Sequence, residues 1–141
     1  MRSMQSEQPD SPPPLVFFID RSLGRHRVAE VFRNRGHQVV LMADLYLDGA
    51  DQFVGDDDWI RDVAHRDWVA LSKDTRIASM HQSALRESTL RLFVLNHANL
   101  TGDEMAARFE LHYPRIIERA EIPGPYVDVV GANSVGRLWE P

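Results

Sequence analysis

Blocks of apolar residues alternate with amphipathic stretches along this chain, and the alternation predicts strands that are followed by helices. Continuous apolar runs typical of strands buried in a parallel sheet occur at 15–20, 37–42, 68–72 and 90–95. Apolar residues at helical spacing predict helices from a Ser22 cap to about Arg35, over 56–66, over about 76–86 and onward from Thr101. Two final runs, 126–130 and 135–139, predict a closing hairpin.

Glycine, proline and capping residues mark where these elements end. Gly36 follows the first helix, at a place where a helix end favours positive φ. Thr101 and Glu104 have the spacing of a capping box. Pro114 is expected to bend or break the last helix, because proline lacks an N–H group.

Strands that alternate with helices across short loops predict an α/β fold, with a mainly parallel central sheet covered on both faces. Residues 1–14 are polar and rich in proline, so we expect a disordered leader. Residues 15–141 are expected to form a single domain, because no repeat or second domain is visible and the length suits one core.

Composition excludes several classes of protein. The chain has 141 residues, 43% of them hydrophobic, and no cysteine, so disulfide scaffolds, zinc fingers and thiol nucleophiles are ruled out. Even the run Leu15–Ile19, which no other apolar run exceeds in length, is far shorter than the ~20 residues of a membrane span. Asp20 follows that run at once and no small-residue cleavage site is present, which disfavours a secretory signal. We therefore expect a cytoplasmic protein.

The net charge of −5 is unevenly distributed. Residues 44–67 are rich in aspartate, whereas residues 21–35 are rich in arginine. A net-acidic protein should not bind nucleic acid through its overall field. A basic face, or a divalent cation that neutralises clustered carboxylates, would still allow such binding.

Three groups of aspartates are predicted to meet at one edge of the sheet. Asp20 ends the first strand, Asp74 follows the third, and Asp56–Asp58 begin the helix before the third strand. Ligands of open parallel sheets bind beyond the carboxyl ends of the strands. Crowded carboxylates raise one another's pKa, and Mg²⁺ relieves the repulsion while keeping waters and substrate phosphates as ligands. Such a site suits metal-assisted hydrolysis of a phosphodiester.

Each aspartate also has a purely structural interpretation. Asp56–Asp58 and Asp74 could cap helices and complement the helix dipole. Asp103 and Glu104 are better explained as parts of a capping box. The histidines have no metal-ligand spacing, and we interpret them as surface or core residues.

Four segments in order resemble the PIN-like toxins of the VapC type: FFIDRSLG (17–24), DDDWI (56–60), WVALSKDTRI (68–77) and RLFVLNHANLTGDEM (91–105). The resemblance runs from about Val16 to the final hairpin. It implies an α/β/α sandwich, a ribonuclease that depends on Mg²⁺ or Mn²⁺, and a toxin of a type II toxin–antitoxin pair that a VapB-type antitoxin holds inactive.

By position, the resemblance implies catalytic roles for Asp20, Asp56 and Asp74. The metal ligands would be Asp20, Asp74 and an acid within Asp56–Asp58, with Asp56 favoured and Asp57 next. Arg21, Lys73 and Arg76 flank these acids and are candidates for contacts with RNA phosphates. The chain departs from the wider pattern after the fourth strand, where Asn96 and Asn99 stand in place of a fourth acid. A site with three acids puts tight binding of two metals in doubt.

Helical geometry separates the three consecutive aspartates, because successive positions lie about 100° apart. Asp56 shares a face with Ile60, four residues on, and should turn inward. Asp58 has the same spacing to Asp62 and should face solvent, while Asp57 is intermediate.

Two alternatives to the nuclease remain open. One is another phosphoryl-transfer protein, although receiver domains have paired acids after the first strand and dehalogenase-type phosphatases have DxD, where this chain has Ser22. The other is a non-catalytic PIN-like binding module. We also expect a homodimer or an antitoxin complex that forms through apolar surface. One sheet cannot easily bury every large apolar side chain, and the candidates are Leu23, Trp59, Trp68 and Trp139. The alternative is that all four lie in the core.

Overall fold

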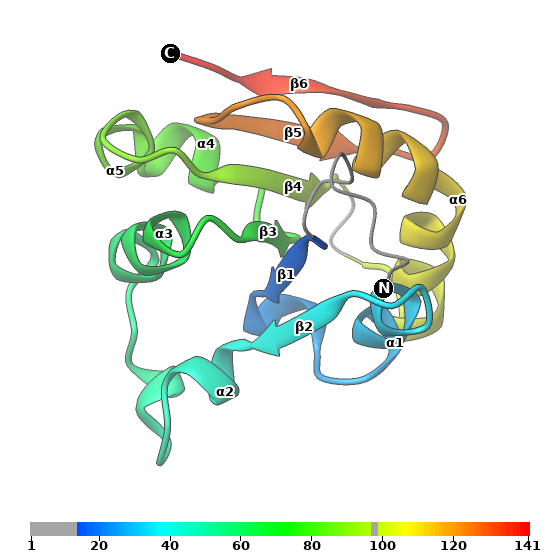
Figure 1. The fold of residues 1–141 in the computed structure, drawn as a ribbon, viewed down its shortest axis with the longest axis horizontal. Coiled ribbons are helices and arrows are strands. Elements are labelled where there is room, and N and C mark those ends of the chain that lie inside the picture. Colours follow the sequence, from blue (N-terminus) through cyan, green and yellow to red (C-terminus); the bar gives the residue numbers. More distant parts are fainter. Residues whose placement is uncertain (1–13, 97–98) are drawn as a thin grey trace, which may run out of the picture.

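The computed structural model describes residues 14–96 and 99–141, which form an α/β/α sandwich (Figure 1). Six strands make one sheet in the order β2-β1-β3-β4-β5-β6. The first five are parallel and only β6 is antiparallel. The strands are β1 (Val16–Ile19), β2 (Gln38–Leu41), β3 (Val69–Ser72), β4 (Arg91–Leu95), β5 (Tyr126–Val130) and β6 (Val135–Trp139). The predicted fold class and closing hairpin are confirmed.

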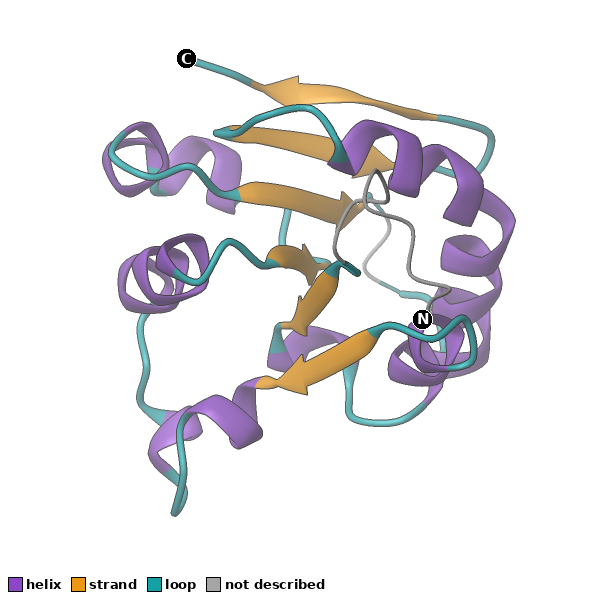
Figure 2. Ribbon diagram, in the orientation of Figure 1, coloured by secondary structure: helices purple, strands orange, loops and turns teal. Residues whose placement is uncertain are grey.

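Helices cover both faces of the sheet (Figure 2). They are α1 (Arg27–Arg33), α2 (Met42–Leu45), α3 (Asp56–His65), α4 (Ile77–Met80), α5 (Gln82–Arg86) and α6 (Gly102–Ala120), with short 3-10 helices at Arg21–Leu23 and Ala50–Gln52. No helix in the described ranges is both long and apolar enough to cross a membrane. The predicted disordered leader lies outside the described residues, except for Pro14.

Two hydrophobic clusters lie on opposite faces, because successive strand residues point to opposite sides of the sheet. Phe17 and Ile19 pack with α1 and α6, whereas Phe18 between them packs with α3, α4 and α5. Trp59 stacks on Phe18, with 5.5 Å between ring centroids. Both clusters therefore hold the carboxyl end of β1, and with it Asp20, in a fixed position.

Two details of the helix prediction are wrong, and a third is wrong in part. Ser22 does not cap a long helix, because the chain forms a 3-10 turn at Arg21–Leu23, passes through Gly24 at φ 77° and begins α1 only at Arg27. The helix expected over 76–86 is interrupted at His81, which divides α4 from α5. Helix α6 runs through Pro114, so proline does not break it, and only the bend of the two expected effects is left.

The predictions for the helix end at Gly36 and for the cap at Thr101 are confirmed. Gly36 has φ 88°, as expected after a helix. The Thr101 hydroxyl accepts the Glu104 N–H at 3.1 Å, and the Glu104 carboxylate accepts the Thr101 N–H at 2.8 Å, so the capping box is confirmed.

The apolar surface predicted from large side chains is only partly present. Leu23 and Trp59 are buried in the core, whereas Trp68 and Trp139 are partly buried. The most exposed large apolar side chain among the described residues is Phe53, at 89%.

Gly124, in the loop between α6 and β5, allows this loop to pass close to the residues that precede β4. A Cβ atom at this position would lie under 3.0 Å from the carbonyl oxygens of both Thr89 and Leu90.

Gly124→Ala is therefore expected to destabilise the fold by about 1–3 kcal/mol, as overpacking does. Urea denaturation should show the loss. Gly136→Ala in β6, where a Cβ atom would meet nothing within 4 Å, is the control and should not destabilise the fold. Equal stability of the two variants would contradict the expectation.

Candidate active site

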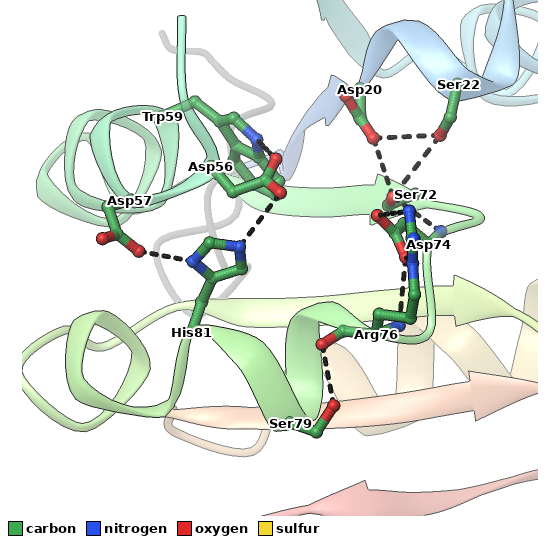
Figure 3. A network of polar contacts seen from close by, with 10 residues as sticks. All are labelled: Asp20, Ser22, Asp56, Asp57, Trp59, Ser72, Asp74, Arg76, Ser79 and His81. Atoms are coloured by element: carbon green, nitrogen blue, oxygen red, sulfur yellow. Dashed lines mark hydrogen bonds and ion pairs between the residues drawn. The ribbon is translucent and has the colours of Figure 1, made fainter.

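Asp20 lies immediately after β1, at the carboxyl edge of the sheet. Its N–H donates to the Leu71 carbonyl at 3.0 Å, so pairing with the neighbouring strand fixes its backbone. Its side chain is buried, with 7% exposed. One oxygen, Oδ2, accepts hydrogen bonds from the Ser72 hydroxyl at 2.8 Å and the Ser22 hydroxyl at 2.9 Å (Figure 3). The carboxylate is therefore held rigidly in one orientation.

Burial is the main influence on the ionisation of this group. Loss of solvation raises the pKa of Asp20 above its usual value, and the nearby Asp56 carboxylate raises it further. The Ser72 and Ser22 hydroxyls act in the opposite direction, because they stabilise the charged form. Asp20 and Asp56 are thus close enough for their charges to interact, as crowding at the sheet edge predicts.

Ser72, the last residue of β3, joins Asp20 to Asp74. Its hydroxyl donates to Asp20 and accepts the Asp74 N–H at 3.1 Å. The Ser22 hydroxyl likewise accepts the Lys73 N–H at 3.2 Å. Two serines that the sequence analysis did not assign to the site therefore hold the loops after β1 and β3 together.

Asp74 is paired with Arg76, two residues on. The guanidinium contacts both carboxylate oxygens, with Nε 3.0 Å from Oδ1 and Nη2 3.3 Å from Oδ2. The Arg76 N–H also donates to Oδ1 at 3.0 Å. The hydrogen bond from the Arg76 side chain is the largest cause that holds the pKa of Asp74 below its usual value.

Asp56 occupies the first position of α3 and points toward the same edge (Figure 3). The indole N–H of Trp59 donates to its Oδ1 at 2.8 Å, and His81 Nε2 lies 3.2 Å from its Oδ2. Because Trp59 is fully buried, it anchors Asp56 to the core. The other nitrogen of His81, Nδ1, lies 2.6 Å from Asp57 Oδ1.

His81 contacts the acidic start of α3, a role that the interpretation of the histidines as surface or core residues did not include. It bridges two aspartates from the break between α4 and α5. No spacing along the chain reveals this contact, because Asp57 and His81 are 24 residues apart.

The three consecutive aspartates differ in exposure in the predicted order. The exposed fractions of the side chains are 32% for Asp56, 55% for Asp57 and 68% for Asp58. Asp58 pairs with Arg61 at 3.5 Å on the outer face of the helix. Asp56 is thus the member of the triplet that turns most toward the core.

The cations proposed for phosphate contacts are placed differently from one another. Lys73 and Arg76 line one recess of about 400 Å³ together with Ser22, Asp74 and Thr75. Arg21 instead donates to the main-chain carbonyl of Asp51 and lies 3.7 Å from Met42 Sδ. Its guanidinium therefore points toward the β2 side of the edge.

No further acid joins the group from β4 in the described residues. Asn96 accepts a hydrogen bond from Arg108 at 3.1 Å, and Asp103 pairs with Arg27 at 2.9 Å on the outside of the fold. Asp103 thus has a structural role at the start of α6, but in an ion pair with Arg27 and not in the capping box, which Thr101 and Glu104 form.

The donor chemistry of the edge fits a hard divalent cation, since Asp20, Asp56 and Asp74 present only oxygen ligands. Within the described ranges, however, no three acidic or histidine side chains lie close enough to form a ready-made metal cage. Mg²⁺ usually takes one or two protein carboxylates and completes its shell with water and substrate phosphates. The pair Asp20 and Asp56, with Asp74 joined through Ser72, fits that manner of binding.

Comparisons with known proteins agree with this architecture. The family described as "PIN like domain" matches residues 15–97. A protein of Mycobacterium tuberculosis (strain ATCC 25618 / H37Rv), named "Putative ribonuclease VapC45", is 28% identical over 123 residues, which cover 86% of this chain and 89% of that protein. No solved structure matches the chain significantly. The family match spans more than half of the chain, and the resemblance to VapC-type proteins is confirmed, so the chain belongs to the PIN-like domain family.

Proposed function

We propose that this protein is a Mg²⁺-dependent endoribonuclease, the toxin of a type II toxin–antitoxin pair. The observation that carries the proposal is the buried Asp20, which two serine hydroxyls orient at a sheet edge that it shares with Asp56 and Asp74. Membership of the PIN-like family and the ribonuclease name of the Mycobacterium tuberculosis relative support the same function. An RNA substrate also suits the cytoplasmic location expected from the sequence.

Asp20, Asp56 and Asp74 would hold Mg²⁺ or Mn²⁺, with Asp57 beside them. A divalent cation supplies a Lewis acid for the phosphate and lowers the pKa of a water molecule. Ser72 and Ser22 fix the Asp20 carboxylate, and Trp59 fixes that of Asp56. These supports reduce the reorganisation needed when substrate binds.

The flanking cations bind the RNA backbone in this proposal. Lys73 is the only lysine of the chain, and it shares a recess with Arg76 next to Asp74. Their positive charges counter the acidic edge and stabilise charge that develops on the phosphate. Arg21 would contact the RNA farther along the edge, on the β2 side.

Cleavage by the purified protein tests the proposal. Internal cuts in a labelled single-stranded RNA are expected with Mg²⁺, should cease with a chelator and should return when Mg²⁺ is restored. A preparation that binds this RNA but cuts no RNA under any of these conditions would instead favour a non-catalytic PIN-like module.

The aspartate triplet gives a graded prediction. Asp56→Ala is expected to reduce cleavage sharply, because it removes an inward carboxylate that Trp59 and His81 hold in place. Asp58→Ala should keep activity and lose only a helix-dipole contribution of about 0.3–1 kcal/mol. Asp57→Ala should fall between them. Cleavage rates of the three variants, measured at saturating Mg²⁺ on the same RNA, check this order. An inactive Asp58→Ala protein together with a fully active Asp56→Ala protein would contradict it.

A VapB-type antitoxin is the proposed protein partner, on the basis of the VapC name of the relative. Exposed apolar side chains suited to such contacts remain on the surface, at Leu47, Phe53 and Met80. Co-purification from the native host should recover a small antitoxin with the chain. If the protein stays monomeric at high concentration and no partner co-purifies with it, both the antitoxin complex and the homodimer would be contradicted.

A further inference from the structure

The pairing of Arg76 with Asp74 bears on how metal and RNA would enter this site. Asp74 Oδ1 accepts two donors, the Arg76 N–H and Nε, both at 3.0 Å. Oδ2 accepts Arg76 Nη2 at 3.3 Å. A carboxylate offers about four lone-pair positions, so only one remains, on Oδ2. A divalent cation at that position would lie beside a guanidinium of the same sign.

We propose that Arg76 exchanges partners: it neutralises Asp74 in the metal-free protein and moves onto an RNA phosphate when a divalent cation takes its place. The inference rests on the proposed function. It gives the Arg76 side chain two successive roles. The first is to pair with the metal ligand Asp74, and the second is to bind the substrate.

Release of the guanidinium should need little free energy. The Arg76 side chain is 75% exposed, and exposed ion pairs contribute little to stability. The Asp74 carboxylate would keep its orientation after release, because the Arg76 N–H still donates to Oδ1 and the Asp74 N–H still donates to Ser72. The exchange therefore leaves the metal ligand in place.

An open recess with room for a phosphate group lies beside the guanidinium. Arg76 and Lys73 line the same recess of about 400 Å³, and the backbone of Arg76 is fixed, since its carbonyl accepts the Ser79 hydroxyl at 3.1 Å and the Met80 N–H at 2.8 Å. A planar guanidinium fork binds phosphate and carboxylate oxygens with similar geometry. The same side chain can thus serve both partners in turn.

Substitution of Arg76 by glutamine separates the two tasks, because it should affect metal and RNA in opposite directions. Without RNA, Arg76→Gln is expected to bind Mn²⁺ about two- to fivefold more tightly than the unsubstituted protein, which corresponds to the loss of a competing exposed ion pair. At saturating Mn²⁺, its affinity for a short single-stranded RNA should fall about tenfold, as expected for one lost charge-assisted hydrogen bond. Electron paramagnetic resonance of free Mn²⁺ measures the first quantity, and stopped-flow fluorescence anisotropy before turnover measures the second.

Arg115→Gln is the matched control. It makes the same change of charge at an exposed ion pair with Glu118, in the half of α6 that leads away from the carboxyl edge. Both of its affinities should equal those of the unsubstituted protein.

The outcomes distinguish this inference from the proposed function. If the unsubstituted protein binds Mn²⁺ and cleaves RNA, but Arg76→Gln binds Mn²⁺ no more tightly than Arg115→Gln, the exchange is wrong and the nuclease stands. Tighter Mn²⁺ binding with unchanged RNA affinity would also overturn the exchange, because Arg76 would then not reach the phosphate. A protein that neither binds Mn²⁺ nor cleaves RNA would overturn the proposed function, and the exchange with it.

Discussion

Asp20→Asn is expected to reduce RNA cleavage at least about 100-fold, since even outer partners of metal ligands are worth 10–100-fold. The substitution keeps the shape of the side chain and one oxygen for the serine hydroxyls. It removes one of two interacting anions from the sheet edge. Cleavage rates measured beside thermal unfolding should show an inactive protein that is as stable as the parent or more so.

The stability gain should depend on pH. Burial raises the pKa of Asp20 in the folded protein, so folding favours the protonated carboxyl. Below the ordinary pKa, both the folded and the unfolded chain are protonated and the charge has no cost. The parent should lose stability relative to Asp20→Asn as the pH rises from the ordinary pKa through the raised one, when both are measured with a chelator.

Asp58→Asn is the control for the active-site assignment. It makes the same chemical change on an outward-facing member of the acidic edge. A folded Asp20→Asn protein that cleaves RNA as fast as Asp58→Asn would remove Asp20 from the catalytic group.

Asp128→Ala is expected to destabilise the fold by about 3 kcal/mol, because breaking a buried ion pair leaves an uncompensated charge. Asp128 lies on β5 with its side chain fully buried. It accepts Arg119 Nε at 2.6 Å and Arg137 Nε at 2.7 Å, and so joins α6 to the closing hairpin. Arg137 also lies over the Tyr126 ring, 4.5 Å from its centroid. Urea denaturation measures the loss.

Glu140→Ala tests whether burial is the cause. Glu140 also pairs with Arg137, at 2.9 Å, but 64% of its side chain is exposed. An exposed pair contributes about 0–1 kcal/mol, so this variant should unfold close to the parent. Similar losses in the two variants would show that Asp128 does not act as the buried centre of the network.

The sequence predicted the strands because burial on both faces leaves long apolar runs. The run at 15–20 contains β1, and the hairpin 126–130 and 135–139 matches β5 and β6 residue for residue. The start of α3 at Asp56 was also predictable, since an acidic first turn complements the helix dipole.

Tertiary contacts explain where sequence reasoning failed. Pro114 ends no helix, because buried Phe109 and Ile116 on either side pack α6 against the sheet, and this packing outweighs the ~3 kcal/mol cost of proline. The Ser22 hydroxyl binds Asp20 and does not cap a helix. The position of Asp20 depends in turn on its backbone hydrogen bond to β3, which no local pattern reveals. Pairings such as Asp57 with His81 arise only when distant segments meet, so local patterns do not reveal them.

The distribution of RNA ends in cells tests the central claim most directly. RNA should be sequenced from its ends after the parent protein or Asp20→Asn is produced at equal levels in the same cells. New internal ends are expected at a limited set of sites with the parent, and none of these ends with Asp20→Asn. Identical end profiles for the two proteins, while growth is arrested by the parent alone, would contradict an endoribonuclease and point to another activity at the same carboxylates.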